Sequence, residues 1–312
     1  MANSANDFRN NPKNPIDHEK SEKGIRIGLR RMRTQPRIAF LIPIPSGPRT
    51  KDWRVGCALF RQTLSSIFNS TVQDYCVVVA GHEAPDFELP QDHCLKFLSL
   101  DHPLPSQEKG DYPAAVKDKM IKLAAAWDCA KSAWNPQHVM KLDWDDLISS
   151  RLVEWLVSVK DEAGYLLKHG WIWRSQIPFL VQRTEYFDRV CGSCLIIRSD
   201  LADQTGPFLT HVEGTKLSPE EHRFAADDHY SLVPGSEIGS LLLNDSHQRY
   251  TAQFDYLGQR LATVPFNAAV CRIGHGNNAG RPFGTETTRM LLGRLRRTRL
   301  ITPRLRKEFM LA

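Results

Sequence analysis

Three carboxylates within four residues are the strongest chemical signal in the sequence. Asp143, Asp145 and Asp146 directly follow the apolar run 138–142. Like charges this close repel one another, and at the end of a buried strand they are costly unless a cation neutralises them. In an extended segment Asp143 and Asp145 would point the same way, about 7 Å apart. Because carboxylate oxygens suit Mg²⁺ or Mn²⁺, the cluster predicts a divalent metal site.

Three other interpretations of this cluster can be weighed on the sequence. A solvated turn that caps the helix beginning near Ser149 would need one carboxylate, not three. An EF-hand loop needs Gly at its sixth position, where Ile148 stands. A phosphatase of the haloacid dehalogenase type opens its domain with Asp-x-Asp followed by Thr, whereas this cluster lies mid-chain and continues with Leu147. The metal site is the interpretation that uses all three side chains.

Several other residues could have a chemical role, and each of them also has a purely structural interpretation. Lys119 and Lys122 share a face of one predicted helix and would reach a diphosphate, or simply face solvent. Trp171 and Trp173 lie on one side of a predicted strand, as a sugar platform or as core. The seven cysteines are scattered, and the Cys191-x-x-Cys194 pair lacks a second pair for zinc, so we expect a structural role for it.

The elements that would position these residues alternate between strands and helices. Apolar runs predict strands at 38–42, 75–80, 95–100 and 138–142, and helical spacing predicts helices at 55–68, 114–133 and 149–159. This alternation predicts an α/β fold with a mostly parallel sheet flanked by helices. Less regular strands are expected at 165–173, 190–197 and 261–273, in a smaller mixed region. Ligands of parallel sheets bind at the carboxyl ends of the strands, where the acidic cluster lies.

Three segments carry a resemblance to a known family: the run Ile38-Ala39-Phe40-Leu41-Ile42-Pro43, the helical segment Leu64-Ser65-Ser66-Ile67, and residues 139–146 with their Asp-x-Asp. In that order they are similar to the first strand and nucleotide loop, the usual helix and the Asp-x-Asp strand end of GT-A glycosyltransferases, which are nucleotide-sugar enzymes, of the family 2 type. The resemblance covers residues 38 to about 231. The resemblance implies a GT-A-like, Rossmann-like sheet.

The same resemblance implies roles for the residues at the sheet edge. Asp145 would be the principal ligand of Mn²⁺ or Mg²⁺, Asp143 would face the ribose or share the metal, and Asp146 would assist. Pro43 would belong to the nucleotide loop and Lys119 to the diphosphate site. The family commonly carries an acidic residue at the end of the second strand to hold the base, and here Glu83 is the substitute.

Two further positions gain a role through this resemblance. In the inverting branch an acidic pair supplies the general base, which matches Asp227 and Asp228, with Asp228 as the base. The alternative is a helix start with Asp at its cap. In some GT-A enzymes a histidine near the C-terminus completes the metal site, a place that His275 would take among its glycines. The alternative for His275 is a glycine-rich surface turn.

Charge divides the chain into three parts: a flexible basic leader (1–36), the GT-A-like domain (37–280) and a basic amphipathic segment (281–312). Residues 1–36 hold eight basic and four acidic residues, and 289–312 hold eight basic and one acidic, which leaves 25 basic and 30 acidic residues between them. This central part lacks the basic face that nucleic acid requires. The C-terminal segment suits either an anionic membrane surface or packing on its own domain.

The sequence therefore predicts a metal-dependent glycosyltransferase. It would move a hexose from a nucleotide diphosphate sugar to a hydroxyl of a glycan or lipid-linked glycan. No apolar run is long enough to span a membrane and the N-terminus lacks a signal peptide, so we expect a cytoplasmic location, with peripheral contact at the inner face of the membrane through the C-terminal segment. The alternatives are a nucleotidyltransferase on a related fold and an inactive nucleotide- or glycan-binding module.

Overall fold

The structure, a computed structural model, describes residues 35–92, 94–104, 112–204, 209–211, 230–232, 243, 247, 249–276 and 296–311. The chain divides into two compact units, residues 1–31 and 32–312. Every described residue belongs to the second unit, so the fold and the sites below are those of this unit alone.

A seven-stranded sheet forms the main body of this unit, in the order β12-β6-β9-β4-β1-β2-β3. All neighbours in it are parallel except β9, which runs antiparallel to β4 and β6. Its strands are β1 (Ile38–Pro43), β2 (Tyr75–Gly81), β3 (Leu95–Ser99), β4 (His138–Lys141), β6 (Gly164–Leu166), β9 (Leu195–Arg198) and β12 (Leu261–Thr263). The prediction of an α/β fold with a mostly parallel sheet is confirmed at this level.

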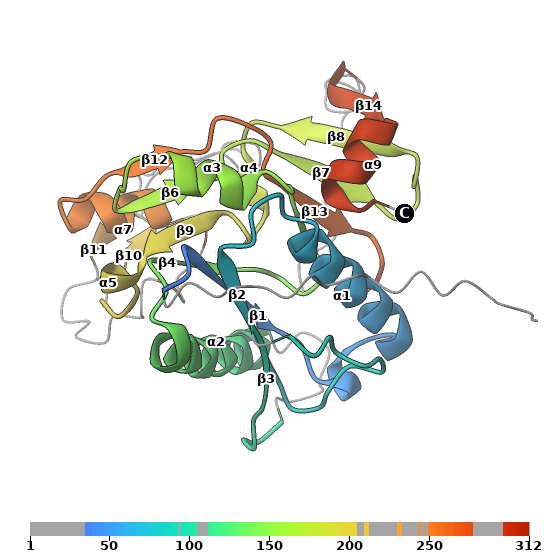
Figure 1. Ribbon diagram of the computed structural model, residues 1–312, viewed down its shortest axis with the longest axis horizontal. Coiled ribbons are helices and arrows are strands. Elements are labelled where there is room, and N and C mark those ends of the chain that lie inside the picture. The colour runs from blue at the N-terminus through green and yellow to red at the C-terminus, as the bar shows by residue number, and fades with distance from the viewer. Residues whose placement is uncertain are drawn as a thin grey trace, which may run out of the picture. The chain divides into compact units, whose positions relative to one another are not determined.

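The central strands are buried on both faces, as their unbroken apolar runs require. Every residue of β1 and β2 is buried. Helix α2 (Tyr112–Trp134) lies on one side of these strands and α1 (Trp53–Phe68) on the other (Figure 1). Asp52 caps α1 by accepting a hydrogen bond from the backbone N–H of Val55 at 3.0 Å. The remaining helical segments are η1 (Gly47–Arg49), α3 (Leu152–Ser158), α4 (Phe187–Val190), α5 (Ser199–Ala202) and α7 (Tyr250–Tyr256).

A second sheet of five strands follows the order β14-β8-β7-β13-β5. Its strands are β5 (Leu147–Ile148), β7 (Gly170–Arg174), β8 (Leu180–Thr184), β13 (Ala269–Ile273) and β14 (Thr298–Leu300). The last helix, α9 (Pro303–Phe309), packs on this sheet, and its Phe309 joins Val181 and Val270 in a small second core. A separate two-stranded pair consists of β10 (Leu209–His211) and β11 (Tyr230–Leu232).

Two predicted strands turn out to be two strands each, divided between the sheets. The run 165–173 breaks at Lys168, so that β6 joins the large sheet and β7 the small one. The run 261–273 likewise becomes β12 and β13, which lie in different sheets. Within each of these two runs the chain crosses from the large sheet to the small one, and the second crossing places β13 beside β5, which directly follows the acidic segment.

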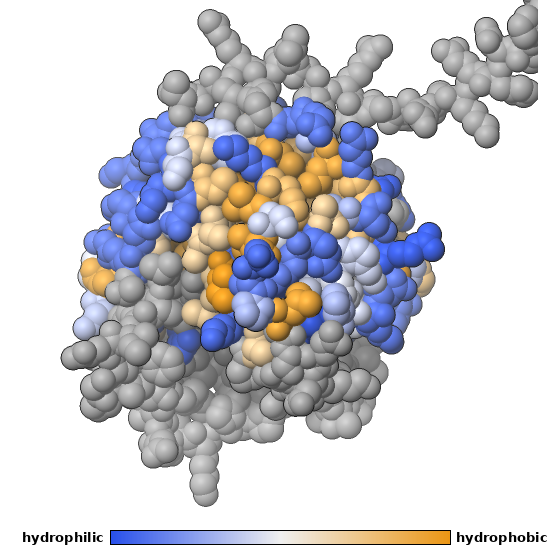
Figure 2. Space-filling view, turned by 90° about the horizontal axis from the view of Figure 1, so that it is seen from below, coloured by the Kyte–Doolittle hydropathy of each residue, from blue (hydrophilic) through white to orange (hydrophobic). Residues whose placement is uncertain are grey.

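No helix in the described ranges is both long and apolar enough to cross a membrane. On the face of the molecule shown in Figure 2, apolar residues gather in a central band that hydrophilic residues border. An apolar area bordered by polar residues is ordinary for the surface of a folded protein.

Candidate functional site

The acidic segment forms a turn, not a continuation of the strand. Strand β4 ends at Lys141, and the backbone N–H of Asp146 then donates to the carbonyl of Asp143 at 3.1 Å. The expectation that Asp143 and Asp145 share the direction of an extended segment was therefore wrong. The capping alternative was wrong as well, because α3 begins after Arg151 with no side-chain cap. We call residues 143–146 the acidic turn.

Asp145 meets His275 at the carboxyl end of the strands. The Oδ2 atom of Asp145 lies 2.7 Å from Nε2 of His275, and both side chains are largely buried. His275 reaches this point because β13 ends at Ile273 and a left-handed Gly274 turns the chain, with φ of +81°. Two of the four predicted metal ligands are thus brought together from distant parts of the chain, and together they offer a carboxylate oxygen and an imidazole nitrogen.

Asp143 pairs with Lys119 of α2 through a charge-assisted hydrogen bond. Burial favours neutral forms, but the mutual attraction outweighs it, so the pKa of Lys119 is raised and that of Asp143 lowered. The turn at Gly192 comes close as well, since a side chain there would approach Asp143 Oδ2 to 3.2 Å. Lys119 was expected either to reach a diphosphate or to face solvent; its side chain is 37% exposed, and its ammonium group is held at the acidic turn.

Asp146 points away from the other two carboxylates into a buried network. Its Oδ2 accepts hydrogen bonds from Ser193 at 2.7 Å and from the Cys191 thiol at 3.0 Å, and its Oδ1 accepts from the backbone N–H of Arg272 at 3.2 Å. Burial, followed by the charges of Asp145 and Asp143, raises the pKa of Asp146 to about 7. Both oxygens accept hydrogen bonds from protein groups, which makes Asp146 a brace of the turn. Its carboxylate also lies close enough to the thiols of Cys191 and Cys271 to share a metal ion with them, so its expected part in metal binding stays a prediction.

Arg272 is the residue of this site that the sequence reasoning missed. Its buried guanidinium donates to the carbonyl of Asp145, to the carbonyl of Leu59 at 2.6 Å and to Thr63 Oγ1 at 3.0 Å. Thr63 in turn donates to the carbonyl of Trp144 at 2.8 Å. Burial lowers the pKa of Arg272 to about 10, against the pull of the nearby carboxylates. Arg272 therefore ties β13, α1 and the acidic turn into one unit, and His275 follows it by three residues.

Aromatic stacking fixes the outer side of the acidic turn. Trp144 stacks on Trp53, with ring centroids 6.1 Å apart. Trp144 also packs against the backbone of α1, where a Cβ at Gly56 would lie 2.0 Å from its ring. Only glycine at this position lets the ring approach the helix so closely.

The residues expected to bind the nucleotide lie beside the turn. Pro43 ends β1 and is buried next to Ala80 of β2. Glu83, just after β2, accepts a hydrogen bond from the backbone N–H of Gly47 and so fixes the loop that follows β1. Both residues therefore lie, like Asp143, at the carboxyl ends of the parallel strands, which is where the resemblance places the nucleotide.

A second polar cluster lies at the ends of β2 and β3. Nε2 of His82 and of His102 lie 3.0 and 2.9 Å from one carboxylate oxygen of Asp118, and Lys122 donates to the other at 2.6 Å. The side chains of His82, His102 and Asp118 have ligand atoms close enough to share a metal ion. Burial raises the pKa of Asp118, but Lys122 and the two histidines reverse this effect. Because Lys122 already neutralises the carboxylate, the cluster is complete without an ion, and Lys122 is not the solvated residue we expected.

Several other expected residues have simple placements. Asp227 and Asp228 lie outside the described residues. Cys191 and Cys194 are both buried free thiols, which agrees with a structural role. Trp171 and Trp173 are partly buried against the second core.

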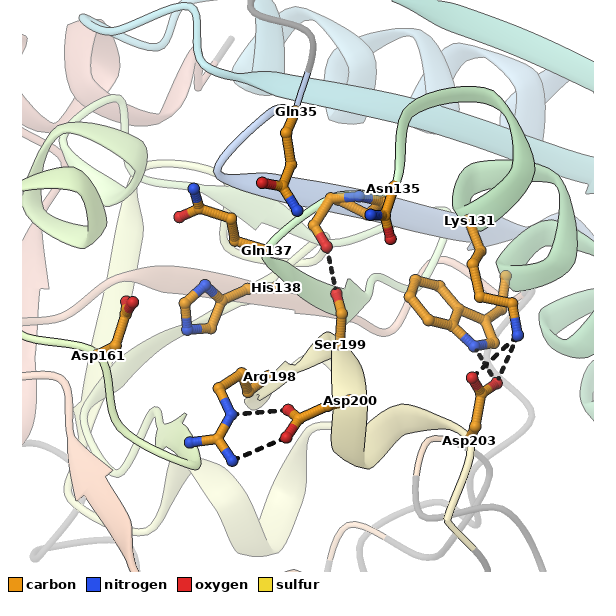
Figure 3. A pocket seen from close by; sticks show the side chains of 12 residues that line it. Gln35, Lys131, Asn135, Gln137, His138, Asp161, Arg198, Ser199, Asp200 and Asp203 are labelled. Atoms are coloured by element: carbon orange, nitrogen blue, oxygen red, sulfur yellow. Dashed lines mark hydrogen bonds and ion pairs between the residues drawn. The ribbon is translucent and has the colours of Figure 1, made fainter.

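A pocket of about 430 Å³ lies at the other end of the large sheet (Figure 3), where β4 begins with His138. Its charged side chains are already paired: Arg198 with Asp200 at 2.6 Å and Lys131 with Asp203 at 2.9 Å (Figure 3), and Asp161 with Arg37, outside the pocket, at 2.6 Å. Ligands of parallel sheets bind at the carboxyl ends of the strands, and this pocket is at the amino end. The acidic turn therefore remains the candidate functional site.

The chain matches no protein-family model and no curated protein sequence.

Proposed function

We propose that the chain is a metal-dependent glycosyltransferase of the GT-A type, which moves a hexosyl group from a nucleotide diphosphate sugar to a hydroxyl of a glycan or lipid-linked glycan. The observation that carries this proposal is the contact between Asp145 and His275 at the carboxyl end of the parallel strands. A buried carboxylate and imidazole that converge there, beside a lysine held by a second carboxylate, form a site for a cation and a diphosphate together.

Asp145 and His275 would hold Mn²⁺ or Mg²⁺. Their donor atoms lie 2.7 Å apart, so the residues present fit an ion with oxygen and nitrogen ligands. When bound, the ion would neutralise charge that develops on the diphosphate leaving group. Arg272 would hold both ligands in position, because it donates to the Asp145 carbonyl and anchors the strand that leads to His275.

Lys119 and Asp143 would act on the donor as a pair. The ammonium group of Lys119 would bind a phosphate oxygen of the donor. In the absence of the donor, Asp143 holds it at the acidic turn. Once Lys119 turns to the phosphate, Asp143 is free to accept a hydrogen bond from the ribose. Asp228 would be the general base that takes the proton from the acceptor hydroxyl, with Asp227 beside it.

The first prediction tests the cation site. Asp145→Asn removes the charge without changing the volume, so Mn²⁺-dependent binding of nucleotide diphosphates should be lost while the fold is kept. Calorimetric titration of a panel of nucleotide diphosphates, with Mn²⁺ or with EDTA, measures this. His275→Gln should weaken the same binding.

Asp200→Asn is the control, because it makes the same chemical change at an exposed carboxylate that pairs with Arg198 at the amino end of the large sheet. This residue lies outside the acidic turn, so Mn²⁺-dependent binding should survive. The metal model fails if Asp145→Asn and EDTA both leave nucleotide binding unchanged. Binding without turnover of any nucleotide sugar would instead favour an inactive binding module.

A further inference from the structure

A second pocket, of about 330 Å³, lies at the amino end of the five-stranded sheet. Its walls are the amino ends of β7 and β13 and the first turns of α9. His275 lies beyond the opposite end of the parallel pair β7 and β13, about 15 Å away along strands of five residues. The pocket is therefore separate from the acidic turn, although its volume falls in the range of ligand sites, roughly 300–1,000 Å³.

The charges around this pocket leave two guanidinium groups for a ligand. Arg151 is already occupied, since it pairs with Glu308 at 3.0 Å and stacks over the ring of Phe266 at 4.7 Å. Arg183 and Arg304 line the same pocket, and within the described part of the chain neither guanidinium group has a hydrogen bond or an ion pair. Glu308 lines the pocket as well, but Ser149 and Arg151 already donate to its Oε1. The two remaining arginines favour an anion, because their planar groups match phosphate or carboxylate.

The remaining lining residues favour a ring that carries hydroxyl groups. Trp171 is the direct cross-strand neighbour of Arg183, so the indole and the guanidinium lie on the same face of the sheet. His169 and Asn267 also line the pocket, and their Nδ1 and Oδ1 atoms are buried without a hydrogen-bond partner among the described residues. Such atoms are costly to leave unpaired. A hydroxyl can donate or accept, so it would satisfy either of them.

We propose that this pocket binds a sugar carrying a phosphate or carboxylate group. Trp171 would contact the ring, Arg183 and Arg304 would bind the anionic group, and hydroxyls would pair with His169 and Asn267. The site is distinct from the proposed donor site and does not depend on the metal.

Calorimetric titration of the full chain with glucose 6-phosphate, glucuronate, glucose and inorganic phosphate tests this proposal. We expect saturable binding of the two anionic sugars, with glucose and phosphate each at least about tenfold weaker. Arg183→Gln and Arg304→Gln should each weaken binding of glucose 6-phosphate about tenfold, because each removes a charge-assisted hydrogen bond. Both arginines are exposed, so these variants should fold.

Two further variants make the outcome decisive. Arg260→Gln removes an exposed arginine outside the pocket and should leave binding unchanged. Asp145→Asn should also leave it unchanged, whether or not nucleotide binding depends on that residue. The proposal is overturned if neither anionic sugar saturates, if phosphate alone binds as tightly as glucose 6-phosphate, or if Asp145→Asn abolishes the binding.

Discussion

The three aspartates of the acidic turn carry the same charge, but each lies in its own environment. Asp143 faces Lys119, Asp145 faces His275, and Asp146 faces buried N–H, O–H and S–H donors. Because the three side chains face different partners, each charge is compensated separately. This lowers the repulsion among them that the sequence predicted. It also separates their roles, so that variants of neighbouring residues should have different effects.

Asp228 provides the test of the chemical step. If it is the general base, Asp228→Asn should lower turnover by at least ~10²-fold and leave donor affinity nearly unchanged, because the base acts on the acceptor hydroxyl. Steady-state rates and donor titrations of the variant measure the two effects separately. A variant that keeps most of its turnover would assign the base to another residue or indicate a retaining reaction.

His138 makes stability depend on pH. Burial, and then the charge of Arg37, lower the pKa of this imidazole to about 4. Between pH 4 and 6.5 the unfolded chain binds this proton and the folded chain does not, so stability is full above pH 6.5 and falls as pH decreases toward 4. At pH 5 the loss from this one group is roughly 2 kcal/mol.

The check is urea unfolding of the wild type and of His138→Asn at pH 7.5 and pH 5. Other groups titrate in both proteins, so the comparison isolates His138. The stability of the variant should fall less between the two pH values, and equal losses in the two proteins would contradict the assignment.

At the scale of elements, α9 is part of the domain and not an appended tail. Phe309 is buried in the second core, Asn69 Nδ2 donates to the carbonyl of Lys307 at 2.7 Å, and Ser149 Oγ donates to Glu308 at 2.6 Å. Of the two interpretations of the C-terminal segment, packing on the domain holds for this helix. The helix ends at Met310, whose φ of 54° is left-handed.

Phe309→Ala should therefore destabilise the domain by about 3–5 kcal/mol, as expected for an aromatic ring removed from a core. Met310→Gly, at the next residue, is the matched control: it removes a partly exposed side chain but relieves the left-handed backbone, so stability should change by less than about 1 kcal/mol. Chemical unfolding of both variants measures this. Similar values for the two would show that α9 does not contribute to the cooperative unit.

The sequence predicted those elements whose signal is local. Unbroken apolar runs predicted β1 and β2, because strands buried on both faces are apolar at every position. Helical spacing of apolar residues predicted α1 and α2, because a helix buried on one face is apolar along that face only. Which sheet a strand joins is not local, so the division of 165–173 and 261–273 was missed. Arg272 and the pair His82 and Asp118 were missed for the same reason: each acts through partners from distant segments.

The candidate site was likewise predictable in part. Asp143 and Asp145 stand out because charges directly after a buried strand need a partner, and glycines flag His275. The pairing of Lys119 with Asp143 was not predicted, since a lysine on a helix gives no sign of the side it faces. The bracing role of Asp146 depends on Ser193 and Cys191, which no spacing rule connects to it.

At the scale of the whole molecule, charge is separated between the middle and the ends of the chain. The central residues carry a net negative charge, whereas residues 289–312 hold eight basic residues and one acidic residue. Within this segment Arg296, Arg297 and Arg299 are exposed next to Leu300, which is 68% exposed. The neighbouring Ile301 N–H donates to the carbonyl of Phe179, which is 56% exposed. Exposed apolar groups among arginines are typical of surfaces that bind anionic lipid.

The last prediction is that this surface binds anionic membranes. Removing the C-terminal segment would test it poorly, because the cut would also remove Phe309 from the second core. Replacing Arg296, Arg297 and Arg299 by Gln leaves the core intact. At about 1 kcal/mol per charge near a lipid surface, the triple variant should bind phosphatidylserine vesicles about a hundredfold more weakly at low salt.

Co-sedimentation with vesicles at low and moderate salt measures this affinity. The control replaces Lys160, Lys168 and Arg260 by Gln, which removes the same charge from exposed positions outside this surface. If binding depended on net charge alone, both triple variants would lose affinity equally, and the surface would have no special part in it. A loss confined to the first variant, together with weaker binding of wild type as salt increases, would place the membrane contact at the arginines around Leu300, because screening weakens attraction between exposed charges and lipid.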